Sequence, residues 1–122
     1  MSNVVVNIVD TAYWRIFRGQ DASLLMVFQT NLGASAVASG TTWKCTFRAV
    51  ENDTAAIAVD LATGSGIVSD SVAGSVVMSL TDTQTAALAT GTLYGQLWRN
   101  DSGVKQCVGR IELTVMERVT VI

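Results

Sequence analysis

SLTDTQTAALATGTLYGQLWR, which spans Ser79–Arg99, is the stretch of the sequence that decides the fold. Thr81 and Gln84 have the spacing of a capping box, in which each side chain accepts a hydrogen bond from the backbone N–H of the other residue. The alanine-rich segment that follows contains good helix formers, and Gly91 is the residue type that ends helices in the left-handed conformation. We therefore expect a short helix over residues 82–89.

The residues that follow the expected helix alternate with the period of a β-strand. A short helix between two strands, in a chain otherwise made of strands, marks a corner where the chain crosses from one sheet to another. This segment therefore predicts two packed sheets joined by a corner helix. The alternating strand places Leu93, Gly95 and Leu97 on one face and Tyr94, Gln96 and Trp98 on the other.

The rest of the chain consists of further short strands separated by turns rich in Gly, Ser, Asn and Asp. Residues 22–30 carry an apolar set on each face, whereas residues 41–50 alternate apolar with polar side chains. This spacing predicts an all-β fold, an antiparallel β-sandwich, with residues 1–122 forming a single domain. The other expected strands cover residues 13–18, 55–61, 75–80, 93–99 and 104–115, with strand-like arms at residues 3–9 and 117–122.

The composition limits the classes of function. Hydrophobic residues make up 49% of the 122 residues and charged residues 15%, with a net charge of −2. This balance excludes a basic nucleic-acid footprint, and no apolar run is long enough to span a membrane. The first residues lack the basic region and apolar core of a signal peptide, so we expect synthesis and retention in the cytosol. The sparse charge favours contacts with other chains over a monomer covered in Ser, Thr and Gly.

The two cysteines, Cys45 and Cys107, are expected at inward positions on strands that flank the strand of residues 93–99. Strands two positions apart in a sheet are separated by about 9–10 Å. A disulfide requires Cα atoms within about 7 Å of each other. We therefore expect two buried free thiols, which suits a reducing cytosol.

The sequence contains no residue set that predicts catalysis. It has no histidine, the commonest general base and metal ligand, so neither thiol has a partner to activate it. Most of the acidic residues fall in turns or at the expected helix start, where carboxylates cap backbone N–H groups. The cysteines lack the spacing of a metal site. We expect no catalytic residues, no metal and no cofactor.

The apolar arms and a few aromatic residues are the candidate interface. The arms are too apolar to lie free in water, so they pair within the domain as edge strands or add to the sheet of a neighbour, which we favour. The aromatic residues contact the core or another subunit, or alternatively stack on a carbohydrate ring. The candidates are Val4, Val5, Val6 and Ile8, then Trp14, Tyr94 and Trp98, then Val119, Val121 and Ile122.

Four segments resemble a family of phage virion modules: FRGQDASLLMVF at residues 17–28, WKCTFR at 43–48, SLTDTQTAALATGTLYGQLWRNDSG at 79–103 and VGRIELTV at 108–115. In that order they resemble the Ig-like β-sandwich modules of phage tail and baseplate proteins. That group includes the N-terminal domain of upper baseplate proteins of phages infecting Gram-positive bacteria. The resemblance covers most of the chain.

The resemblance implies an Ig-like sandwich and a non-enzymatic structural subunit of the virion, made in the host cytoplasm. Its place would be the tail, baseplate or fibre attachment region, as an adaptor that binds other virion proteins and its own copies. A capsid decoration (cement) protein is the alternative within the class. A carbohydrate-binding module that uses Tyr94 and Trp98 is the alternative of another class, with a glycan as its partner.

Overall fold

The computed structural model of the chain describes residues 11–28 and 40–120. This part of the chain is almost entirely β-structure, with one helix of a single turn. The elements are β1 (Thr11–Phe17), β2 (Ala22–Val27), β3 (Thr42–Arg48), β4 (Ile57–Thr63), β5 (Gly66–Asp70), β6 (Ser75–Leu80), α1 (Asp82–Ala86), β7 (Gly91–Asp101) and β8 (Val104–Met116).

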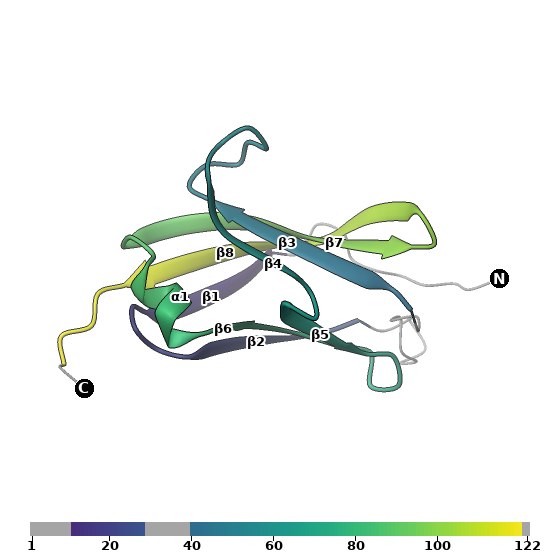
Figure 1. Cartoon of the computed structure of the whole chain (residues 1–122), viewed down its shortest axis with the longest axis horizontal. Coiled ribbons are helices and arrows are strands. Elements are labelled where there is room, and N and C mark those ends of the chain that lie inside the picture. Colours follow the sequence, from purple (N-terminus) through teal and green to yellow (C-terminus); the bar gives the residue numbers. More distant parts are fainter. Residues whose placement is uncertain (1–10, 29–39, 121–122) are drawn as a thin grey trace.

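The strands form one continuous sheet that folds over into two layers, in the order β1-β8-β7-β3-β4-β5-β6-β2. Figure 1 shows β3, β4, β7 and β8 in one layer and β2, β5 and β6 in the other. The continuous sheet folds from one layer into the other at the tight turn between β4 and β5. In this turn the Ser65 N–H donates to the Ala62 carbonyl at 2.8 Å. In immunoglobulin terms, β8, β7, β3 and β4 take the positions of strands G, F, C and C′, and β2, β6 and β5 those of B, E and D. The chain is therefore an Ig-like β-sandwich.

The sandwich is not wholly antiparallel, which corrects the expectation from the sequence. β1 pairs with β8 in parallel, from Thr11 opposite Arg110 to Phe17 opposite Met116. β4 and β5 make a second, very short parallel pairing. A parallel ladder as long as that of β1 with β8 needs a long connection, and almost the whole domain lies between these two strands. The β4–β5 pairing is limited to two residue pairs beside the turn that joins the strands. Strand periodicity carries no information on the direction of the partner strand.

The corner helix begins as predicted and ends earlier. The Gln84 N–H donates to the Thr81 hydroxyl at 3.2 Å, and the Thr81 N–H donates to the Gln84 side-chain oxygen at 2.9 Å. The helix nevertheless ends at Ala86. The Leu88 N–H donates to the Thr85 carbonyl, which closes a tighter turn, and the Leu88 side chain is buried in the core. The expectation of a helix over residues 82–89 with Gly91 as its stop is wrong, since Gly91 opens β7.

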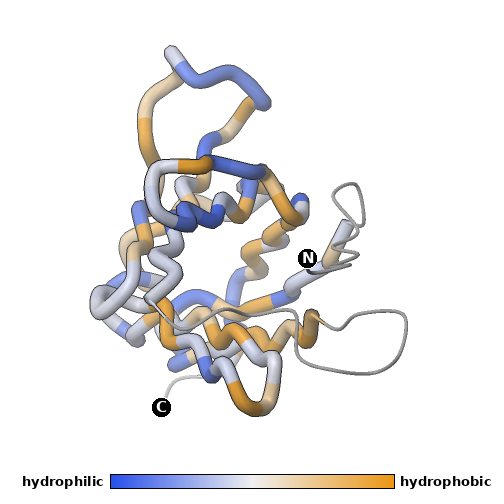
Figure 2. Tube along the Cα trace, turned by 90° about the vertical axis from the view of Figure 1, so that its right-hand side faces the viewer, coloured by the Kyte–Doolittle hydropathy of each residue, from blue (hydrophilic) through white to orange (hydrophobic). Residues whose placement is uncertain are grey.

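The core lies between the two layers and follows the predicted inward positions of most strands. Figure 2, which looks along the sandwich, shows the strands arranged around its middle. The buried core residues of the two layers pack together there. Phe47 is fully buried there, and its ring lies 6.3 Å from that of Trp14. Gly95 faces Phe47 from β7, and a Cβ atom at this position would lie 2.7 Å from Phe47 Cε1. The absence of a side chain at Gly95 makes room for the Phe47 ring.

A bulge in the pairing of β7 with β8 changes the expected faces of β8. Leu97 pairs with Gly109 and Trp98 pairs with Cys107, so Val108 is an extra residue. Val108 therefore turns into the core with 1% of its surface exposed, and Cys107 lies opposite Trp98 on the outer surface. Both thiols are free, and β7 lies between their strands as predicted. The expectation that both are buried is wrong, because Cys107 is partly exposed.

Candidate functional site

The outward side chains of β4, β3, β7, β8 and β1 form one continuous surface, which we name the aromatic face. Buried residues alternate with these positions along each strand, so register pairing brings the outward residues into rows across the sheet. The rows are Lys44–Trp98, then Asp60–Thr46–Gln96–Arg110, then Arg48–Tyr94–Glu112–Tyr13.

Trp98 lies on β7, the middle strand of this face, in the row at one end. Trp98 is 43% exposed, and its indole N–H donates to the Gln96 side-chain oxygen at 3.2 Å, which orients the ring on the sheet. Two open hollows, with volumes of about 260 Å³ and about 390 Å³, adjoin Trp98. Lys44 and Trp98 line both of them. The smaller one is also lined by Tyr94 and by the turn of residues 50–53. An exposed indole held between two hollows can insert into, or stack on, a binding partner.

The charges on the aromatic face are largely neutralised within it. The Lys44 ammonium lies 3.0 Å from the Asp60 carboxylate, which also accepts a hydrogen bond from Thr46 at 2.6 Å. The Thr46 hydrogen bond, assisted by Lys44, holds the pKa of the Asp60 carboxyl below its ordinary value. Arg110 forms an ion pair with Glu51 of the turn after β3. The face therefore offers aromatic rings among paired charges, with no strong field of either sign.

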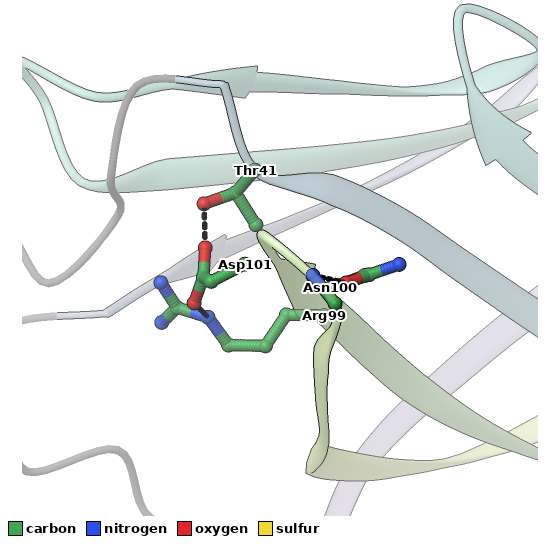
Figure 3. A network of polar contacts seen from close by, with 5 residues as sticks. Thr41, Arg99, Asn100 and Asp101 are labelled. Atoms are coloured by element: carbon green, nitrogen blue, oxygen red, sulfur yellow. Dashed lines mark hydrogen bonds and ion pairs between the residues drawn. The ribbon is translucent and has the colours of Figure 1, made fainter.

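A buried polar network lies beneath one end of the face, at the end of β7 (Figure 3). Arg99 is 5% exposed, and its Nε lies 2.9 Å from the Asp101 carboxylate, which also accepts a hydrogen bond from the Thr41 hydroxyl. The Arg99 guanidinium lies 5.4 Å above the ring of Trp43. These contacts tie the start of β3 to the end of β7. The network fixes the strand that carries Trp98 and contains no activated nucleophile.

The described residues contain no cluster of three or more His, Cys, Asp or Glu side chains that could hold a metal ion. Burial raises the pKa of Cys45 to about 12, so its thiol stays protonated at neutral pH and is a poor nucleophile. Within 11–28 and 40–120, no helix is long and apolar enough to cross a membrane.

The aromatic candidates from the sequence divide between the surface and the core. Tyr94 and Trp98 do lie together on the aromatic face. Trp14 is only 5% exposed, so its assignment to the interface is wrong. It pairs with the buried Leu113 across the β1–β8 ladder and points into the core. Sequence reasoning missed Tyr13, which is 70% exposed, although an inward Trp14 requires an outward Tyr13.

The apolar arms are described only in part. β8 ends at Met116, and the chain from Glu117 to Thr120 forms no strand, so the strand-like arm predicted there is wrong over these residues. Glu117 instead forms an ion pair at 2.9 Å with Arg18, which lies in the turn that follows β1. Val119 is 98% exposed. The remaining candidates lie outside the described residues: Val4, Val5, Val6, Ile8, Val121 and Ile122.

The sequence matches no model of a known protein family, and it matches no curated protein. Among solved structures, the NK cell receptor Nkp44, described as a triggering partner in natural cytotoxicity, is similar with a TM-score of 0.46 and 15% sequence identity. The similarity covers 88% of this chain and 99% of the receptor chain. The Ig-like assignment made above follows from the strand order of this chain itself.

Proposed function

We propose that this chain is a non-enzymatic assembly subunit that binds a partner protein through the aromatic face. The observation that carries the proposal is the exposed Trp98, oriented by Gln96, in a surface that also presents Tyr13 and Tyr94. Trp, Tyr and Arg are the residues enriched at the energetic centres of protein interfaces. Arg48 lies beside Tyr94 on this face, and Arg110 lies beside Gln96.

The proposed partner is another protein of a phage virion, in the tail, baseplate or fibre attachment region. This placement is supported by the sequence resemblance of the four segments described above. The lack of histidine and the protonated state of Cys45 support a role without catalysis. The paired charges of the aromatic face favour a partner surface of mixed polarity over a nucleic acid.

Mass spectrometry of purified particles, after separation of heads from tails, tests the placement. The proposal expects the chain in the tail fraction. Recovery in heads alone would favour the capsid decoration role, and absence from both fractions would contradict a virion role.

Incorporation of variants into particles tests the face. Trp98→Ala should reduce incorporation by about thirtyfold or more, since truncating a hot-spot tryptophan of an interface costs about 2 kcal/mol or more. Val104→Ala is the matched control, because Val104 is 69% exposed on the β7–β8 hairpin and does not belong to the aromatic face. Equal incorporation of the two variants would remove the aromatic face from the proposal.

A carbohydrate-binding module is the second candidate function. It is favoured by the Trp98 ring beside a hollow that Asn52, Asp53 and Gln96 also line, since sugars stack on aromatic rings and hydrogen-bond to such groups. Titration of the protein with neutral sugars, followed by tryptophan fluorescence, tests it. A saturable shift that disappears in Trp98→Ala would favour glycan binding over the assembly role.

A further inference from the structure

β1 lies at one end of the sheet order, and its backbone is firmly held there (Figure 1). It pairs with β8 along its whole length without a register shift. Its inward side chains Trp14 and Ile16 are 5% and 1% exposed, whereas the inward side chains of β2, at the other end of the order, are only partly buried. Among the described residues, no strand pairs with the outer edge of β1. This edge is therefore a rigid template for a further strand.

The backbone groups that remain open on this edge belong to alternate residues of β1. In a parallel ladder, one residue directs its N–H and C=O groups to the neighbouring strand, and the next residue directs them to the other side. The Arg18 N–H donates to a carbonyl of β8 at 2.9 Å, so the odd-numbered residues of β1 are those that face the open edge. The N–H of Phe17 is already closed, because it donates to the Gln20 side-chain oxygen at 2.6 Å. Tyr13 and Arg15, in the middle of the strand, direct their N–H and C=O groups to the open edge.

The side chains of these two residues give the edge its chemistry. Tyr13 is 70% exposed, and Arg15 is exposed two residues further along the strand. Arg15 has no ion-pair partner among the described residues. The sequence of β1 contains no acidic residue, so pairing with the same strand of a second copy cannot neutralise Arg15. The edge therefore favours a strand of different sequence, with an acidic residue opposite Arg15 and an apolar residue opposite Tyr13.

We infer that the outer edge of β1 binds an extended segment of the partner protein, which joins the sheet as an antiparallel strand. The segment carries Asp or Glu opposite Arg15 and, two residues later, a β-branched or aromatic residue opposite Tyr13. Main-chain hydrogen bonds to these two residues supply affinity, and the alternate side chains supply specificity. The antiparallel direction is the more stable one per residue. The inference rests on the proposed function for the partner, an assembly protein, and adds the way in which that partner is bound.

Titration of the full chain with a capped peptide of sequence TETVTVT, followed by amide NMR spectra, tests the inference. The peptide should shift the backbone amides of Tyr13 and Arg15 saturably. Arg15→Glu should weaken binding about fivefold, because the cross-strand charge pair changes from attraction to repulsion. The peptide with Lys in place of Glu should recover this loss with Arg15→Glu. Lys105→Glu is the matched control, since it reverses an exposed charge on β8 outside the ladder with β1 and should bind as the wild type does.

A modified peptide tests the main-chain pairing without any change to the protein. N-methylation of its Glu residue removes the N–H that donates to the Arg15 carbonyl and places a methyl group against β1. This peptide keeps every side chain of the original, so it should cause no saturable shift only if the strand pairs through its backbone.

Three results would overturn the inference. They are wild-type amides of Tyr13 and Arg15 that do not shift, an N-methylated peptide that binds as the original does, and an Arg15→Glu chain with an unchanged preference between the Glu and Lys peptides. Failure of the proposed function is seen separately, in the incorporation of Trp98→Ala into particles. A chain that binds the peptide and is incorporated without Trp98 would keep the strand site and lose the aromatic face.

Discussion

Replacement of Gly95 by alanine is expected to destabilise the fold by about 1–2 kcal/mol, because β7 passes directly over the Phe47 ring. The added Cβ would lie 2.7 Å from Phe47 Cε1, 2.8 Å from Phe47 Cδ1 and 3.1 Å from Cys45 Sγ. Phe47 and Cys45 are fully buried, so neither can move into solvent. Overpacking of this kind costs about 1–3 kcal/mol. With both neighbours fully buried, the clash lies in the upper part of this range, about 2–3 kcal/mol. Removing the backbone freedom of a strand glycine returns about 0.5–1 kcal/mol, which leaves a net cost of about 1–2 kcal/mol.

Thermal and urea unfolding measure this effect. With an unfolding entropy of about 2.1 cal/mol/K per residue, a loss of about 1–2 kcal/mol lowers Tm by about 4–8 °C for a chain of this length. Phe47→Leu removes the ring atoms that the new methyl group meets, so the double variant should be more stable than the sum of the single variants predicts, by about 1 kcal/mol. A Gly95→Ala protein as stable as the wild type, or a strictly additive double variant, would refute the packing of β7 on Phe47.

Four further expectations concern the polar network, the helix cap and the two thiols. Asp101→Ala should lower the free energy of unfolding in urea by about 1–3 kcal/mol, because it removes the carboxylate beside the buried Arg99 while Asp101 itself is partly exposed. Thr81→Ala removes the helix cap and should cost about 1 kcal/mol in the same assay, with little cost for Thr81→Ser. Iodoacetamide should modify Cys107 in the folded protein and Cys45 only after unfolding. A Cys107 that stays unlabelled in the native state would contradict the β8 bulge, and native labelling of Cys45 would contradict its burial. Because burial raises the pKa of Cys45 from 9.0 to about 12, the stability that the protonated thiol contributes is complete below pH 9.0 and is lost progressively as the pH rises toward 12. Cys45→Ala should show no such loss.

Features that depend on neighbouring residues in the chain could be predicted from the sequence. The capping box between Thr81 and Gln84 is one, because both partners lie within a single turn. The apolar residues on both faces of the segment 22–30 are a second such feature. They indicate that one apolar set, which includes Leu25, lies on the outward face of the strand. The surface that these outward residues form with β5 and β6 could not be read from the chain, because it depends on strand order.

Features set by a partner strand could not be predicted. The bulge beside Trp98 depends on the register of β7 against β8, and it reversed the expected side of Cys107. Trp14 was misplaced because pairing with β8, rather than the weak alternation of β1, decides which side chains point inward. The helix ended early because Leu88 has to reach a core that only the complete sandwich creates.

The parallel ladder between β1 and β8 has a mechanical consequence. β1 begins beside Arg110 and ends beside Met116, so the described chain enters the sandwich at one end and leaves it at the other (Figure 1). Tension applied along the chain would pull these two strands past each other lengthwise. Every rung of the ladder then bears the load at once, instead of opening one after another, so a molecule tethered at both sides would resist stretching in this direction.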